Sequence, residues 1–239
     1  MHYPVDSVVR AIFLRRPNRF IAHCLLDGEE VICHVKNTGR CRELLIPGAV
    51  VYLCRAAEGS VRKTAYDLIA VEKAGRLINM DSQAPNKAAE AFLRTRFDSV
   101  RAEVQYGESR MDFLAEKGGL KTYVEVKGVT LEKDGAVFFP DAPTERGVRH
   151  IRELIRAVGE GHGAVILCVI QMEDVRYFAP NDATDPAFGK ALREAAEAGV
   201  AVWAYCCHAE PDSMEITDAV EVRLHGNRTP VLEFFNIAR

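Results

Sequence analysis

Two acidic residues and one lysine near the middle of the chain have the types and spacing needed for hydrolysis of a phosphodiester. Asp112 lies in the segment MDFLA, and Glu125 and Lys127 follow in YVEVKG. Side chains alternate along a strand, so Glu125 and Lys127 share a face, and the turn KGGLK pairs their strand with that of Asp112. Such carboxylates bind Mg²⁺ or Mn²⁺, which would activate water, while Lys127 orients that water or stabilises charge on the phosphate.

The same string of residues also occurs without any function. Glu and Lys commonly alternate on the solvent face of an amphipathic strand. Here Val124 and Val126 face the other way, and the neighbouring strands follow in the order that a hairpin needs, which favours a site. Glu90, in the segment before these strands, is a further carboxylate that could reach the metal.

A second polar segment, FPDAPTERGVRHIREL, leads into an expected helix. Arg146 and His150 are four residues apart and share a helical face, where they could contact a phosphate near the helix N-terminus. An ordinary helix cap with solvated charges is the plainer alternative. Gln171 ends an apolar strand, either as a hydrogen-bonded strand-end amide or as a positioning residue beside Lys127.

The loop HVKNTGRCRELLIPG is a candidate nucleic-acid contact in the first part of the chain. The residues in it that could bind phosphates are Lys36, Asn37, Thr38, Arg40 and Arg42. Asn-Thr-Gly is also ordinary turn sequence, so the alternative remains that this loop is basic by chance and has no role in binding. Aromatic residues for base stacking are few, and Phe20, like most of them, is in phase with core positions.

Two-residue alternation runs through the first 80 residues. It predicts strands at 8–14, 20–26, 31–35, 49–54, 65–71 and 76–78, with a tight hairpin at Asp27-Gly28. So many short strands indicate a small all-β barrel. An OB-like barrel is the leading candidate, although an SH3-like barrel would give a similar pattern.

The pattern changes near Ser82, where SQAPN supplies a turn and a cap. The expected elements that follow are a helix within 87–97, strands at 101–106, 111–115 and 122–130, a helix at 145–158, a strand at 164–171, a helix at 186–198 and a strand at 200–206. We therefore predict two domains, residues 1–82 as the OB-like barrel and residues 83–239 as an α/β domain. The element order is that of the restriction-endonuclease-like mixed sheet, the PD-(D/E)xK nuclease type.

Composition excludes several other classes of protein. The chain has 239 residues, of which 48% are hydrophobic and 27% charged, and no apolar run is long enough to span a bilayer. The start of the chain lacks the pattern of a signal peptide, so we expect no membrane association and a cytoplasmic location. Seven cysteines without a CxxC spacing favour reduced thiols. The net charge of −3 argues against an indiscriminate nucleic-acid binder.

The chain resembles the sugar fermentation stimulation protein A (SfsA) family in six motifs, which run in order from about Arg16 to His208. They are HVKNTGRCRELLIPG, APNKAAEAF, VQYGESRMDFL, YVEVKGVTLE, FPDAPTERGVRHIREL and VIQM. The chain departs from the family in VKNTGRC, where many members have a sequence similar to CPNTGSM. The resemblance implies an N-terminal OB-like domain, a C-terminal nuclease-like domain and DNA binding.

Carried over by motif, the resemblance also implies site residues. The metal-binding carboxylates would be Glu90, Asp112 and Glu125, and the catalytic residues would be Asp112, Glu125, Lys127 and Gln171. Among the other motif residues, Arg110, Arg146 and His150 would join the barrel loop in binding nucleic acid.

The leading hypothesis is a nuclease dependent on Mg²⁺ or Mn²⁺ that acts on DNA. A non-catalytic DNA-binding regulator linked to sugar metabolism is the alternative, and a phosphodiesterase acting on RNA or small molecules is a third class. Whether the chain forms a homodimer stays an open question. Many nucleases of this fold are dimers, but the sequence shows no self-complementary patch.

Overall fold

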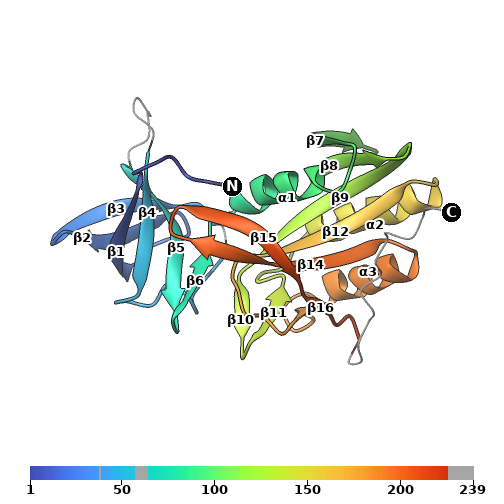
Figure 1. Cartoon of the computed structure of the whole chain (residues 1–239). Coiled ribbons are helices and arrows are strands. Elements are labelled where there is room, and N and C mark those ends of the chain that lie inside the picture. The colour runs from blue at the N-terminus through green and yellow to red at the C-terminus, as the bar shows by residue number, and fades with distance from the viewer. Residues whose placement is uncertain (38, 57–63, 226–239) are drawn as a thin grey trace.

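The computed structural model describes residues 1–37, 39–56 and 64–225, so the predicted contact Thr38 lies outside the described residues. Two regions sit end to end in it (Figure 1). An all-β region from the first third of the chain occupies one end. An α/β region, built around a long twisted sheet, occupies the other.

The N-terminal region is a closed barrel. Its strands are β1 (Val8–Arg15), β2 (Ile21–Leu26), β3 (Glu29–Val35), β4 (Val50–Arg55), β5 (Tyr66–Lys73) and β6 (Arg76–Asn79). They are ordered β3-β2-β1-β4-β5-β6, and β3 also pairs with β5, which closes five strands into a barrel. This closing pair is parallel, while the other pairs are antiparallel. The predicted OB-like barrel is confirmed.

Turn chemistry and small inward side chains explain why this segment closes. Asp27 and Gly28 have φ angles of 52° and 88°, which the two-residue hairpin between β2 and β3 requires. Ala22, Cys24 and Cys33 are fully buried inside the barrel, where little room is left between the strands.

The C-terminal region has a six-stranded mixed sheet in the order β15-β14-β12-β9-β8-β7. Its strands are β7 (Ser99–Tyr106), β8 (Ser109–Lys117), β9 (Leu120–Val129), β12 (Gly163–Ile170), β14 (Ala201–Glu210) and β15 (Ser213–Ala219). Strands β9, β12 and β14 are parallel, and the outer pairs are antiparallel. The predicted mixed sheet is confirmed.

Helices cover both faces of this sheet. They are α1 (Ala84–Arg94), α2 (Glu145–Gly159) and α3 (Pro186–Glu197). Helix α1 packs its buried side chains, Phe92 among them, on the face that carries Val124 and Val126. Helix α2 covers the opposite face, where Glu125 lies against His150. Alternation along β9 therefore separates an apolar face from the polar face on which the candidate site lies.

A second, four-stranded sheet was not predicted from the sequence. It consists of β10 (Leu131–Lys133), β11 (Ala136–Phe139), β13 (Tyr177–Pro180) and β16 (Glu221–Val222), in that order. Strand β15 of the large sheet was also missed. Strands of two to four residues are too short to show alternation, although Asp134-Gly135 between β10 and β11 is the same hairpin signal as Asp27-Gly28.

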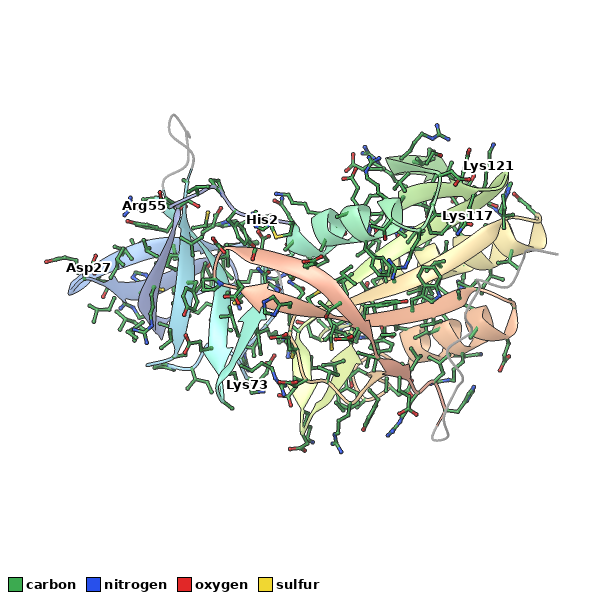
Figure 2. The ribbon with its side chains drawn as sticks, viewed as in Figure 1. His2, Asp27, Arg55, Lys73, Lys117 and Lys121 are labelled. Carbon is green, nitrogen blue, oxygen red and sulfur yellow. The ribbon has the colours of Figure 1, made fainter. Side chains whose placement is uncertain are left out.

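The two regions are joined by more than the covalent chain. One hydrophobic cluster runs through both of them. The Met1 amine donates to the carbonyl of Met214 at 2.7 Å, so the N-terminus reaches back to β15. Lys73, at the tip of the β5–β6 hairpin, pairs with Glu132 of β10 at 2.9 Å (Figure 2).

Two further expectations from the sequence concern the cysteine thiols and membrane-spanning helices. All seven cysteines are buried and free. Cys206 and Cys207 point to opposite sides of β14, in different hydrophobic clusters, so the two cannot easily share one metal ion. Within the described ranges, no helix has both the length and the apolar character that crossing a bilayer requires.

Candidate functional site

Asp112 sits where β8 and β9 separate. The two strands are paired from Lys117 to Phe113, and the next residue, Asp112, uses its side chain in place of the backbone. Its Oδ2 accepts a hydrogen bond from the backbone N of Val126 at 2.8 Å, and its Oδ1 accepts one from Asn86 Nδ2 at 2.8 Å. Asn86 lies at the start of α1. This carboxylate is therefore fixed by one strand and one helix.

Glu125 lies deeper, between β9 and α2. Its Oε1 is 2.6 Å from His150 Nδ1 and 2.5 Å from Lys127 Nζ. Arg146 Nε donates to the other ring nitrogen of His150 at 3.4 Å, so the His150 tautomer consistent with both contacts carries its proton on Nδ1 and donates it to Glu125. We call Asp112, Glu125, Lys127 and His150 the site cluster.

One oxygen of the site cluster has no partner. Glu125 Oε2 is buried and receives no hydrogen bond from any residue that the structure describes. A buried acceptor without a donor is costly, and a carboxylate oxygen more so than a neutral one. The donor set offered here, an unpaired carboxylate oxygen with a second carboxylate nearby, is the type that hard divalent cations bind. Glu125 and Asp112 are thus the residues that could hold a metal.

The two carboxylates have opposite pKa shifts. Burial and the charge of Glu125 raise the pKa of Asp112, and its hydrogen bonds from Val126 and Asn86 do not fully offset them. Burial also acts to raise the pKa of Glu125, but the hydrogen bond from His150 and the charge of Lys127 outweigh it, so this pKa is lowered. The surroundings of Glu125 therefore favour its ionised form. Asp112 is the carboxylate whose ionised form a cation would stabilise most.

Gln171 connects this site to the barrel. It follows β12 and is buried, and its Nε2 donates to Asn79 Oδ1 and to the carbonyl of Asp81, both at 3.2 Å. Its Oε1 lies over Gly128, next to Lys127 in β9, where an added Cβ would come within 2.7 Å of that oxygen. Gly128 is required by this close approach.

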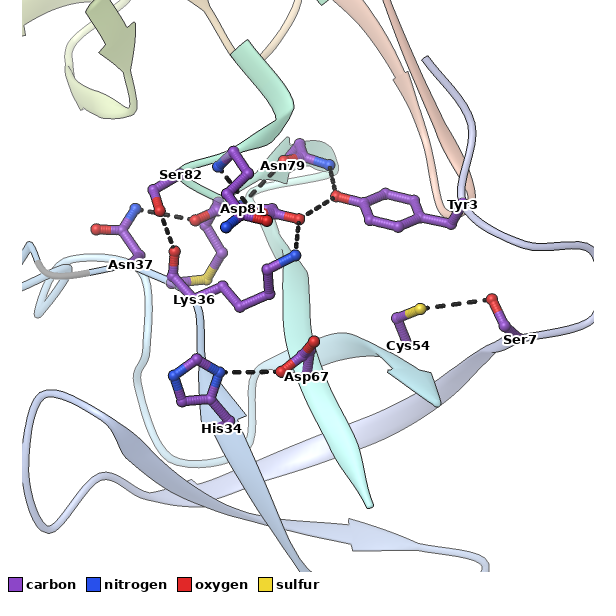
Figure 3. Close-up of polar contacts among 12 residues, drawn as sticks. Tyr3, Ser7, His34, Lys36, Asn37, Cys54, Asp67, Asn79, Asp81 and Ser82 are labelled. Atoms are coloured by element: carbon purple, nitrogen blue, oxygen red, sulfur yellow. Dashed lines mark hydrogen bonds and ion pairs between the residues drawn. The ribbon is translucent and has the colours of Figure 1, made fainter. Parts of the chain in front are cut away.

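Asp81 is the centre of a group of polar contacts at the end of the barrel that faces the α/β region (Figure 3). Its Oδ2 accepts hydrogen bonds from Lys36 Nζ at 2.8 Å and from the Tyr3 hydroxyl at 3.2 Å, and its Oδ1 accepts one from the backbone N of Gln83 at 2.9 Å. Asn79 Nδ2 donates to Tyr3 at 3.0 Å. Tyr3, Lys36, Asn79, Asp81 and Gln171 form what we call the junction cluster.

The other residues predicted for the site have partners of their own. Glu90 lies one helical turn after Asn86, is 41% exposed and pairs with Arg94 at 2.6 Å. Arg110 is exposed and forms an ion pair with Glu103. Among the described residues, no group of three or more His, Cys, Asp or Glu side chains converges as a ready metal site. The roles assigned to Glu90 and Arg110 stay predictions.

The predicted barrel loop divides into two kinds of residue. Lys36 is held by Asp81, and Asn37 donates to the carbonyl of Met80 at 2.9 Å, so both build the loop itself. Arg40 and Arg42 are exposed, and neither side chain has an ion pair within the part of the chain that the structure describes. Among the described members of the loop, these two arginines remain available to a phosphate.

Sequence reasoning missed Asn86 and the junction cluster. Asn86 stands in the motif APNKAAEAF, but nothing in that string indicates a hydrogen bond to a residue 26 positions later. Tyr3, Asn79 and Asp81 have no motif spacing that links them to Gln171. Tyr3, Asn79 and Asp81 come together within the first 82 residues, and Gln171 joins them where the barrel docks on the α/β region.

Comparison with known proteins matches the two regions to two domains of one protein family. Residues 14–80 match the family model described as the SfsA N-terminal OB domain, and residues 82–213 match the sugar fermentation stimulation protein RE domain. A sugar fermentation stimulation protein homolog of Desulfitobacterium hafniense is 53% identical over 216 residues, which are 89% of this chain and 94% of the relative. A homolog of Ruminiclostridium cellulolyticum is 51% identical over 223 residues, 91% of this chain and 98% of the relative.

A solved structure has the same fold along nearly its whole length. It is Pyrococcus furiosus SfsA in complex with Ca²⁺, which is 31% identical and superposes with a TM-score of 0.83. The match covers 93% of this chain and 99% of that chain.

Proposed function

The chain belongs to the sugar fermentation stimulation protein family, and from this premise and the site cluster we propose that it is a DNA-binding nuclease that uses Mg²⁺ or Mn²⁺. The observation that carries the proposal is Glu125 Oε2, a buried carboxylate oxygen without a hydrogen bond, near a second carboxylate with a raised pKa. The structure of the Pyrococcus furiosus relative is a complex with Ca²⁺, which supports a cation site in this chain.

Asp112 and Glu125 would hold the cation, which when bound polarises a phosphate and lowers the pKa of a water molecule. His150 keeps Glu125 Oε1 occupied, so that the unpaired Oε2 is the oxygen presented to a ligand. Asn86 and the backbone N of Val126 hold Asp112 in one orientation. Such preorganised groups avoid reorganisation during the reaction.

Lys127 is the cation of the site cluster. Its ammonium has three donors and uses one of them on Glu125, which leaves two for a phosphate oxygen or an attacking water. Its side chain is 13% exposed, so the charge acts in a partly desolvated place where electrostatic interactions are stronger than in water. Stabilising charge on the phosphate is the role that we propose for it.

A non-catalytic DNA-binding regulator is the second candidate. The observation that favours it is the pairing of Glu90 with Arg94, which leaves two carboxylates rather than three in the described site. In such a protein the arginines would bind DNA, and Asp112 and Glu125 would be dispensable. The link to sugar utilisation would then be a matter of which DNA is bound.

Cleavage assays with labelled single-stranded, duplex and branched DNA, with and without Mg²⁺ or Mn²⁺, distinguish the two. RNA substrates test the third class. We expect Asp112→Asn and Lys127→Met each to reduce cleavage by about 10²-fold or more, the effect of removing a transition-state contact. Lys121→Met is the matched control, because Lys121 lies on the same strand at the distal tip of the β8–β9 hairpin (Figure 2).

Wild-type cleavage that is retained by Lys121→Met and lost in both site variants would support the nuclease. DNA binding without cleavage of any substrate, unchanged by Asp112→Asn, would establish the regulator instead. Cleavage that persists in Asp112→Asn and Lys127→Met would place the chemistry elsewhere in the molecule.

A further inference from the structure

Phe20 lies in the turn that precedes β2 and is the one aromatic residue among the large hydrophobic side chains that are exposed in the described part of the chain. Alternation along β2 puts it in phase with the buried Ala22 and Cys24, so the sequence predicted a core position. The structure corrects this: the strand begins only at Ile21, and the Phe20 ring is 52% exposed. It packs into none of the described hydrophobic clusters, so the barrel core does not account for it.

The backbone holds this ring in a defined place. The side chain of Asn18 accepts hydrogen bonds from the backbone N of Phe20 at 2.9 Å and of Ile21 at 3.0 Å. The carbonyl of Phe20 accepts one from the backbone N of Val35 at 2.8 Å. An apolar ring presented to solvent from a fixed turn loses little conformational entropy when a flat ligand stacks on it.

Two arginines are held near this turn through their backbone. The Arg16 guanidinium donates to the carbonyls of Arg19 at 2.6 Å and of Arg40 at 2.8 Å, so one side chain clamps the β1–β2 turn to the β3–β4 loop. Both Arg19 and Arg40 are exposed, and neither has an ion pair among the described residues. By contrast, Arg15 on the neighbouring strand is neutralised by Glu30 at 2.7 Å.

The same loop leads toward the site cluster. Gly39, next to Arg40, lies so close to Asp141 that a Cβ added there would clash with the Asp141 carboxylate. Asp141 lies three residues before Thr144, the N-cap of α2, and α2 carries Arg146 and His150. The part of the barrel that carries Arg19, Phe20 and Arg40 therefore adjoins the segment that leads into α2. His150 of this helix contacts Glu125.

We propose that Phe20, Arg19 and Arg40 form a contact point for single-stranded nucleic acid, in which a base stacks on the Phe20 ring and the arginines bind the flanking phosphates. A ring with adjacent cations is the combination that binds unpaired strands, because every base has a face to stack while a duplex hides its faces. The contact point deepens the proposed function and rests on it: it makes a single-stranded segment the preferred substrate of the site cluster.

The test measures binding of fluorescent oligo(dT), oligo(U) and a DNA duplex to the full chain at several salt concentrations, in the Lys127→Met background so that no probe is cut. Phe20→Ala is expected to weaken single-strand binding about 5- to 100-fold with little effect on the duplex, and Phe20→Tyr to restore it. Arg19→Ala and Arg40→Ala should each lower the slope of log affinity against log salt by about 1. Ile32→Ala is the matched control, because Ile32 is 50% exposed on the barrel and lies in β3 two residues from the acidic Glu30.

Loss of affinity in Phe20→Ala for oligo(dT), for oligo(U) or for both supports the contact point. Which of the two probes is affected shows whether deoxyribose, ribose or both are accepted. Unchanged single-strand binding, or an equal loss for duplex and single strand, overturns it. If binding is unchanged in Phe20→Ala while cleavage is lost in Lys127→Met, the nuclease stands and only the contact point fails. If the wild-type chain binds no nucleic acid, both fail.

Discussion

The junction cluster and the site cluster are two groups of buried polar residues in the same molecule, and they differ in how fully they are hydrogen-bonded. Within the described residues, no buried side-chain nitrogen or oxygen of the junction cluster lacks a partner. The site cluster leaves Glu125 Oε2 unpaired and contains a carboxylate, Asp112, whose pKa is raised. A completed network fixes one structure, whereas an incomplete one retains the capacity to bind.

The two clusters are nevertheless linked by one residue. Gln171 belongs to the junction cluster, and its Oε1 lies over Gly128, the neighbour of Lys127. The barrel therefore contributes to the position of β9 at the site. The two regions are therefore packed together as one structural unit.

The largest effect on stability is expected from Asp81→Ala. Removal of this carboxylate leaves the partly buried Lys36 ammonium and the Tyr3 hydroxyl without their acceptor, which should lower the free energy of unfolding by about 3–5 kcal/mol. Denaturant unfolding measures it. The matched control is Glu173→Ala, which breaks the exposed ion pair with His208 and should cost no more than about 1 kcal/mol. Equal costs for the two variants would contradict the structural role of the junction cluster.

A smaller loss is expected from Gly128→Ala. The new methyl group would meet Gln171 Oε1 and Pro85 Cγ, both at 2.7 Å, so overpacking should destabilise the protein by about 1–3 kcal/mol. Gly159→Ala is the control, since nothing lies within 4 Å of that position at the end of α2, and it should be neutral or slightly stabilising. Thermal unfolding of both variants compares them, and a neutral Gly128→Ala would show that Gln171 does not press on β9.

Gln171→Leu tests whether this amide links the regions or takes part in catalysis. Loss of the hydrogen bonds to Asn79 and Asp81 should lower stability by about 1 kcal/mol. Cleavage should fall together with stability if Gln171 positions Lys127 through Gly128. A loss of cleavage with wild-type stability would instead make Gln171 a catalytic residue, as the resemblance to the family implies.

The smallest and opposite effect is expected from Asp112→Asn in the presence of a chelator. Because the pKa of Asp112 is raised in the folded chain, its ionisation opposes folding as pH rises through that value. The amide cannot ionise, so the variant should be as stable as the wild type at low pH and at least as stable at neutral pH. Thermal scans from pH 4 to pH 8 in EDTA follow the difference, and a variant less stable at every pH would show that Asp112 is structural.

Sequence alone predicted most of what local patterns encode. The six barrel strands, the three helices and the central strands follow from alternation, turn residues and caps, and the convergence of Glu125 with Lys127 follows from their spacing along one strand. Proximity of Asp112 also follows, because a short hairpin brings its strand alongside β9. These are all contacts between residues that are close in the chain.

Contacts between residues that are far apart in the chain could not be predicted in the same way. Asp81 meets Tyr3 across 78 positions, and Gln171 meets Asn79 across 92. The exposure of Phe20 depends on where β2 begins, which a two-residue period does not determine. The position of His150 against Glu125, 25 residues away, required the packing of α2 on the sheet.

Cation-dependent stability of the site cluster is the most direct measurement. Thermal unfolding of the wild-type chain should shift upward with Mg²⁺, Mn²⁺ or Ca²⁺, by about 2.7 kcal/mol when the cation is at 100 times its Kd. Glu125→Gln and Asp112→Asn should abolish the shift, while Glu173→Ala should retain it. A wild-type chain that gains no stability from any of these cations, or an equal gain in Asp112→Asn and Glu125→Gln, would contradict a cation site at the unpaired oxygen of Glu125.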